Sequence, residues 1–154
     1  RHQYYETVCG GVGAGPDFDG ASAVHTNMTN TRLTDPEVLE WRYPVLLESF
    51  GVRRDTGGAG RHRGGDGTYR RIRFMEEMEV VVLSNHRRIP PYGMDGGEPG
   101  QVGRNWVERK DGTVHEMSGL DAATVHPGGV FVLHTPTGGG YGKAEERILP
   151  EAAE

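Results

Sequence analysis

A short polar stretch in the first quarter of the chain carries the side chains best suited to chemistry. Met28-Thr29-Asn30-Thr31-Arg32 gathers hydroxyl, amide and guanidinium groups, and His25 precedes it. Such groups can orient a polar substrate, and an imidazole can carry a proton at neutral pH. The same groups can equally satisfy backbone polar atoms in an irregular loop. The residues alone leave both interpretations open.

A second charged cluster, Arg61-His62-Arg63-Gly64-Gly65-Asp66, lies among glycines. Guanidinium groups bind carboxylates and phosphates through paired hydrogen bonds, and Asp66 can hold Arg63 in place for that purpose. Taken alone, the cluster favours a loop that is braced by internal ion pairs. The anion-binding interpretation stays as the alternative.

The glycine-rich segments do not match the nucleotide-binding motifs. Gly142-Lys143 is followed by Ala144, and Thr137 stands where a P-loop requires its first glycine. Gly11-Val12-Gly13 lacks a third glycine at the dinucleotide-binding position. Because this spacing is what makes backbone N–H groups converge on phosphate, we expect neither motif to operate here.

The histidines predict no metal site, since they are widely separated and form no His-x-His or His-x-x-x-His pair. A dyad of Cys9 with a distant histidine is conceivable in principle. A half-buried thiol beside a glycine-rich loop is the favoured interpretation of Cys9. We therefore assign no metal ligand in this chain.

The composition narrows the class of protein. The formal net charge of −5 argues against a general nucleic-acid partner, and no apolar run of membrane-spanning length occurs, which argues against a membrane partner. One cysteine excludes an internal disulfide and fits a reducing compartment, the cytoplasm. The opening at Arg1 without an initiator Met or signal peptide is interpreted as an excerpt of a longer chain.

The elements that would position these groups are mostly short strands. Thr34-Asp35-Pro36-Glu37 is a helix start, with Thr34 as the cap, and predicts a helix over about 35–43. Alternating or β-branched runs predict strands over 45–53, 68–74, 78–83, 105–108, 113–117, 123–126 and 130–135. The continuous apolar run 78–83 suits a strand buried on both faces. The fold class predicted is mainly β (α+β).

Glycine fills the connections, contributing 25 of 154 residues, about 16% against a usual ~7%. Glycine adds no side chain to a core, so the chain has little core-forming material for its length. Segments such as 10–16 are expected to need positive φ or close backbone approach. We expect one domain over 1–143 and a charged tail over 144–154.

Six motifs in order carry a family resemblance. They are Tyr4-Tyr5-Glu6-Thr7, Gly10 to Pro16, Val24 to Glu37, Arg63-Gly64-Gly65-Asp66-Gly67, Pro91 to Gly100, and Thr135 to Gly142. The series resembles the C-terminal part of the hydantoinase B/oxoprolinase family, and within it the ATP-dependent 5-oxoprolinases most. Asn27 departs from the pattern, since many relatives carry a histidine there.

The resemblance implies a part of an enzyme that hydrolyses 5-oxo-L-proline to L-glutamate with cleavage of ATP. It implies a hydantoinase A-type, kinase-like half as partner, either fused or separate, and an oligomer. ATP and a divalent metal of the full enzyme would be bound outside this segment, so the isolated chain is expected to be inactive. Relatives also open hydantoins or carboxylate ketones, so a hydantoinase or ketone carboxylase subunit is one alternative. A non-catalytic assembly domain is the other.

We therefore predict five residues nearest the chemistry. His25, Asn30 and Arg32 are predicted as catalytic residues, with His25 as proton carrier and the other two orienting substrate or phosphate. Arg63 and Asp66 are predicted to bind substrate or phosphate, with Asp66 positioning Arg63.

Overall fold

Strands dominate the computed structural model, which describes residues 2–147. In chain order the elements are α1 (Pro36–Arg42), β1 (Val45–Val52), β2 (Thr68–Phe74), β3 (Met78–Leu83), β4 (Arg104–Glu108), β5 (Val114–Met117), β6 (Leu120–Val125), β7 (Val130–His134) and the 3-10 helix η1 (Ala144–Glu146). The fold class predicted from the sequence, mainly β with one short helix, is confirmed.

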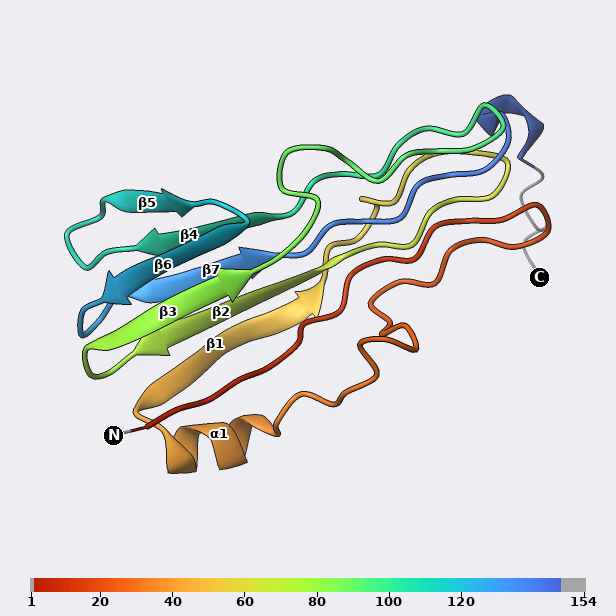
Figure 1. Cartoon of the computed structure of the whole chain (residues 1–154). Coiled ribbons are helices and arrows are strands. Elements are labelled where there is room, and N and C mark those ends of the chain that lie inside the picture. Colours follow the sequence, from red (N-terminus) through yellow and green to blue (C-terminus); the bar gives the residue numbers. More distant parts are fainter. Residues whose placement is uncertain (1, 148–154) are drawn as a thin grey trace, which may run out of the picture.

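Two antiparallel sheets form two layers (Figure 1). The larger sheet has the order β1-β2-β7-β4-β5, and β3 pairs with β6 in the smaller sheet. Two of the four pairings in the larger sheet, β2–β7 and β4–β7, join strands that are not consecutive in the chain, so hairpin signals alone cannot give this order. The β4–β5 hairpin turns at Asp111-Gly112, where Gly112 has φ +86°.

Apolar side chains from both sheets meet between the layers. Phe74 and Val107 of the large sheet pack with Val82 and Val125 of the small one, and Ile72 and Met117 complete the cluster. This arrangement follows from alternation, because successive strand residues point to opposite faces. The core is small for the chain, as the low apolar content predicts.

The other face of the large sheet is polar and bears ion pairs. Arg71 donates two hydrogen bonds to the Glu108 carboxylate, at 2.9 and 2.7 Å. Arg73 pairs with Glu48, and Arg104 pairs with Glu116. These side chains lie around Trp106, Val130 and Val132, which form a second buried cluster.

The cap of helix α1 lies one residue later than predicted, and the helix begins at Pro36. The side chain of Asp35, not Thr34, accepts a hydrogen bond from the backbone N–H of Glu37, at 2.9 Å. Pro36 occupies the first helical turn, where a missing N–H costs nothing. Leu39 is 1% exposed and is the helix residue that packs inward.

The prediction that residues 78–83 are buried on both faces is wrong. Val82 of β3 is buried, but Val81 and Leu83 are 66% and 85% exposed. The small sheet has only two strands and covers the large sheet with one face. An apolar run therefore indicated a strand correctly but did not indicate what covers its second face.

Beyond the strand ends, glycine-rich segments run side by side (Figure 1). We call residues 10–15, 20–24, 57–67, 91–103 and 136–142 the glycine-rich bundle. Backbone hydrogen bonds link its segments: Gly65 N–H donates to the Val12 carbonyl and Gly138 N–H donates to the Gly65 carbonyl, both at 2.8 Å. The bundle is thus held by main-chain contacts across chain segments.

Close approach, and not unusual dihedral angles, explains most of these glycines. Positive φ occurs at Gly96, Gly112, Gly128 and Gly142 only among the glycines of the described chain. By contrast, a Cβ on Gly65 would lie 1.9 Å from the Ala21 carbonyl oxygen. Of the two predicted reasons for glycine in segment 10–16, the structure supports close approach.

The predicted tail is described only in part. Residues 144–146 form η1, and residues 148–154 lie outside the described residues. Within residues 2–147 no helix is long and apolar enough to cross a membrane.

Candidate functional site

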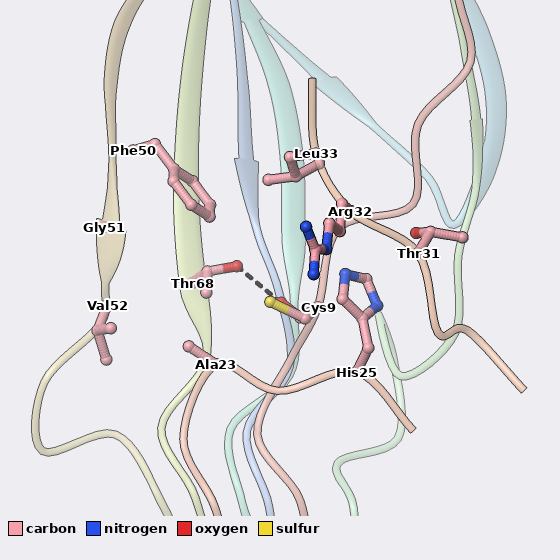
Figure 2. Close-up of a pocket in the computed structure, with 10 residues that line it drawn as sticks. All are labelled: Cys9, Ala23, His25, Thr31, Arg32, Leu33, Phe50, Gly51, Val52 and Thr68. Atoms are coloured by element: carbon pink, nitrogen blue, oxygen red, sulfur yellow. Dashed lines mark hydrogen bonds between the residues drawn. The ribbon is translucent and has the colours of Figure 1, made fainter. Parts of the chain in front are cut away.

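An open pocket of about 450 Å³ lies where the large sheet meets the N-terminal segments. Its lining comes from strands β1 and β2 and from two irregular segments: Cys9, Ala23, His25, Thr31, Arg32, Leu33, Phe50, Gly51, Val52 and Thr68. Figure 2 shows these side chains gathered around the hollow. We call this site the Arg32 pocket.

The floor of the Arg32 pocket is fixed by a hydroxyl pair. Thr68 is 1% exposed, and its Oγ1 donates to the Cys9 carbonyl at 2.7 Å. The backbone N–H of Thr68 donates to the Thr135 Oγ1, also at 2.7 Å. These bonds attach the N-terminal segment to β2, so Cys9 has a defined position in the pocket.

A buried ion pair supports one wall of the pocket. Arg70 is 2% exposed, and its Nε and Nη2 donate to the Glu6 carboxylate at 2.8 and 2.9 Å. The same guanidinium lies 5.4 Å from the ring centroid of Phe50, which lines the pocket. A cation over an aromatic face is attractive, so the Glu6–Arg70 pair restrains the Phe50 wall.

Three predicted catalytic residues lie close together in sequence, but only two line the pocket. His25 and Arg32 do so, whereas Asn30 is exposed and is not a lining residue. The His25 Nδ1 lies 3.4 Å from the Thr29 Oγ1, which also accepts from the Thr26 backbone N–H at 3.3 Å. Their predicted catalytic roles stay predictions.

Arg32 belongs to the half of the fourteen arginines in residues 2–147 that form no ion pair. Seven arginines form ion pairs with carboxylates within 4 Å. Within residues 2–147 Arg32 has no ion-pair partner, and no Asp or Glu lines its pocket. Its guanidinium is therefore available to an anion from solution.

Cys9 has the chemistry of a half-buried thiol. Burial raises the pKa of the Cys9 thiol, because the thiolate loses hydration there. A thiol with a raised pKa is protonated at neutral pH and is a poor nucleophile. The geometry therefore favours a structural role for Cys9, as part of the pocket wall, over a role as a nucleophile.

Neither Arg63 nor Asp66 lines the Arg32 pocket, although the Asp66 carbonyl accepts a hydrogen bond from the N–H of Ala23, a lining residue, at 3.0 Å. The Asp66 carboxylate accepts backbone N–H bonds from Thr56 at 2.9 Å and Gly57 at 2.8 Å. Arg63 Nη2 is 3.7 Å from Asp66 and its Nη1 is 3.3 Å from Asp55. The predicted pairing of Asp66 with Arg63 is present, and the contacts describe a braced loop; substrate or phosphate binding there stays a prediction.

Of the ten lining residues, sequence reasoning predicted only His25 and Arg32 as site residues. Phe50, Thr68 and Cys9 reach it from segments that are far apart in the chain. The available signal was Thr68-Tyr69-Arg70, where polar residues alternate within a strand whose inward face should be apolar. Inward-facing Thr68 and Arg70 require polar partners, and the N-terminal segment supplies them.

A metal ion or a nucleotide phosphate would require particular groups among the described residues. No group of three or more His, Cys, Asp or Glu side chains in residues 2–147 is arranged to hold a metal ion. Many backbone N–H groups of the glycine-rich bundle donate to carbonyls of neighbouring segments.

Taken together, a two-layer β module with a glycine-rich bundle and the Arg32 pocket between its large sheet and its N-terminal segments defines the class of this protein. The chain belongs to the Hydantoinase B/oxoprolinase family, which matches residues 1–144.

Named relatives cover almost all of the chain. The 5-oxoprolinase 1 of Arabidopsis thaliana is 47% identical across 90% of this chain. The 5-oxoprolinase of Saccharomyces cerevisiae is 45% identical across 93% of it. The chain spans only 11% and 12% of the lengths of these two relatives.

A solved structure shares the fold. The ATP-dependent caprolactamase from Pseudomonas jessenii superposes with a TM-score of 0.78 at 27% identity. The match covers 92% of this chain and 26% of the caprolactamase chain. The module is therefore similar to one part of a larger lactam-opening protein.

Proposed function

We propose that this chain is part of an ATP-dependent 5-oxoprolinase, which hydrolyses 5-oxo-L-proline to L-glutamate with cleavage of ATP. The observation that carries the proposal is the level of identity. The two 5-oxoprolinases are 47% and 45% identical to this chain, against 27% for the caprolactamase. Substrate assignment rests on these relatives and not on the shared fold alone.

The Arg32 pocket is the part of this chain that we propose to contact the substrate. His25 would give or take a proton at the opening amide, since an imidazole changes charge near neutral pH. Arg32 would hold an anionic group in place, and Phe50 would exclude water from the ring. Asn30, which is exposed beside the pocket, would act only if the substrate extends beyond the lining.

ATP and a divalent metal are proposed to bind outside residues 2–147. Two observations support this: no cluster of metal-ligating side chains within the described part of the chain, and no P-loop or dinucleotide spacing in the sequence. A lactam is a poor electrophile, so ATP would supply the activation through a kinase-like partner half. We propose a reducing compartment such as the cytoplasm, consistent with the single cysteine.

One experiment separates 5-oxoprolinase from other lactam-opening activities. The intact enzyme containing this segment is incubated with ATP and either 5-oxo-L-proline or hydantoin, and the ring-opened product (glutamate or the N-carbamoyl amino acid) and phosphate are measured. Glutamate and phosphate released with 5-oxoproline alone support the proposal. Turnover of hydantoin without turnover of 5-oxoproline contradicts it and favours a hydantoinase.

A non-catalytic assembly domain is the second candidate, because the exposed surface contains large apolar side chains. Trp41, Leu83 and Leu120 are 84%, 85% and 73% exposed. The variant Arg32→Ala separates the two functions in the intact enzyme. Lower turnover with unchanged oligomer mass, measured by light scattering, supports catalysis; loss of the oligomer with unchanged turnover per assembled particle supports assembly.

A further inference from the structure

The Arg32 pocket combines one kind of charge with an apolar wall. Arg32 and His25 are its only ionisable side chains besides the Cys9 thiol. Phe50, Val52 and Leu33 supply hydrocarbon around the same hollow. The pocket is thus biased towards anions although the whole chain has a net charge of −5.

Its dimensions and polar groups suit a small cyclic ligand. The volume of about 450 Å³ falls within the ~300–1,000 Å³ of small-molecule sites. The Thr68 hydroxyl already donates to the Cys9 carbonyl, so its proton is not available to a ligand. Arg32 is consequently the strongest free donor facing the pocket, as Figure 2 shows.

The arrangement favours a carboxylate over a phosphate. One free guanidinium matches the single charge and the planar, two-oxygen geometry of a carboxylate. A phosphate carries nearly two charges and a third oxygen, and the Phe50 side of the pocket offers it no donor. A ligand with an apolar ring and one carboxylate would contact Phe50 with its ring and Arg32 with its carboxylate.

Resting on the proposed function, we propose that Arg32 is a specificity-determining residue that selects lactams bearing a ring carboxylate over uncharged lactams. The guanidinium forms a paired hydrogen bond with the carboxylate while Phe50 and Val52 pack against the ring. Uncharged lactams lose the paired hydrogen bond with Arg32 and keep the packing against Phe50 and Val52. The pocket thereby distinguishes 5-oxoproline from lactams of the caprolactam type.

The single cysteine gives a direct measurement of pocket occupancy. Cys9 lines the pocket, so alkylation of this thiol by iodoacetamide at mildly alkaline pH reports access to this site. The intact enzyme containing this segment is titrated with 5-oxo-L-proline, 2-pyrrolidinone or inorganic phosphate before alkylation, and the peptide that contains Cys9 is followed. Mass spectrometry then gives the ligand concentration that halves the labelling rate.

We expect 5-oxoproline to protect Cys9 at about 10- to 100-fold lower concentration than 2-pyrrolidinone, the ratio that one charged hydrogen-bonded contact gives. Phosphate should protect less well than 5-oxoproline. Arg32→Met should remove the preference and Arg32→Lys should retain part of it. Arg88→Met, which changes an exposed arginine outside the pocket, should leave the preference intact.

Equal protection by the two lactams, better protection by phosphate, or no protection by any ligand overturns the inference. A preference that survives in Arg32→Met, with thermal unfolding unchanged, also overturns it. The proposed function is tested separately, by glutamate release from the intact enzyme. An intact enzyme that hydrolyses 5-oxoproline with an unselective pocket refutes the role of Arg32 alone.

Discussion

Replacing Gly65 with alanine is a direct test of how the glycine-rich bundle is held together. A Cβ at this position would lie 1.9 Å from the Ala21 carbonyl oxygen and 3.0 Å from the Val12 nitrogen. Both contacts are to backbone atoms, which cannot turn away as a flexible side chain can. The segments would have to separate.

The cost can be worked out from the bonds at this position. Gly65 donates to the Val12 carbonyl and accepts from the Gly138 N–H, both at 2.8 Å. Leaving buried polar groups without partners costs about 1–3 kcal/mol each, so we expect Gly65→Ala to lower the free energy of unfolding by about 2–5 kcal/mol. At ~2–4 °C per kcal/mol for a chain of this size, the melting temperature should fall by roughly 5–15 °C.

Gly13→Ala is the matched control. Gly13 lies in the same bundle, is exposed, and a Cβ there would meet only the Gly139 carbonyl oxygen, at 3.8 Å. Because alanine restricts the unfolded chain, this change should be neutral or stabilising by about 0.4–1 kcal/mol. Thermal unfolding followed by circular dichroism checks both. A Gly65→Ala melting temperature within about 2 °C of the parent would refute the packing argument.

Three other changes test ion pairs and hydrogen bonds of the large sheet and of the segments next to it. Glu6→Gln should lower the free energy of unfolding by about 3–5 kcal/mol, because it leaves the Arg70 charge buried without its partner; urea denaturation measures it. Asp66→Ala should cost about 1–3 kcal/mol by freeing backbone N–H groups, and should speed proteolysis in the loop 55–57. The Arg71 guanidinium lowers the pKa of Glu108 to about 2, so the stability that this pair contributes is present above the unfolded pKa near 4.5 and lost as pH falls towards 2. The Glu108→Gln variant should show a shallower loss of melting temperature over that window, and an unchanged slope would contradict the pairing.

Local signals in the sequence predicted most elements, because those signals act over few residues. Pro36 and Glu37 mark the start of α1, and alternation marks 68–74, which is β2 to the residue. Long-range order was not predictable in the same way. Nothing near residues 78–83 or 120–125 shows that these two strands pair with one another.

The candidate site was predicted in part for the same reason. His25 and Arg32 were found because they lie in one polar stretch, and both line the pocket. Phe50 and Thr68 were missed, since they join the site only through sheet pairing and through the bond from Thr68 to Cys9. Arg63 and Asp66 resembled an anion site by composition. The Asp66 carboxylate, however, accepts hydrogen bonds from backbone N–H groups of Thr56 and Gly57.

The glycine-rich bundle is held by main-chain hydrogen bonds, so its response to heat and to solvent should differ from that of an apolar core. Separation of the segments around Gly65 and Gly138 would expose amides more than hydrocarbon, and exposure of polar surface lowers heat capacity where apolar exposure raises it. Unfolding of this chain should therefore show a heat-capacity change per residue below that of ordinary domains. Amide protons in these segments should also exchange slowly with deuterium, although no helix or strand contains them.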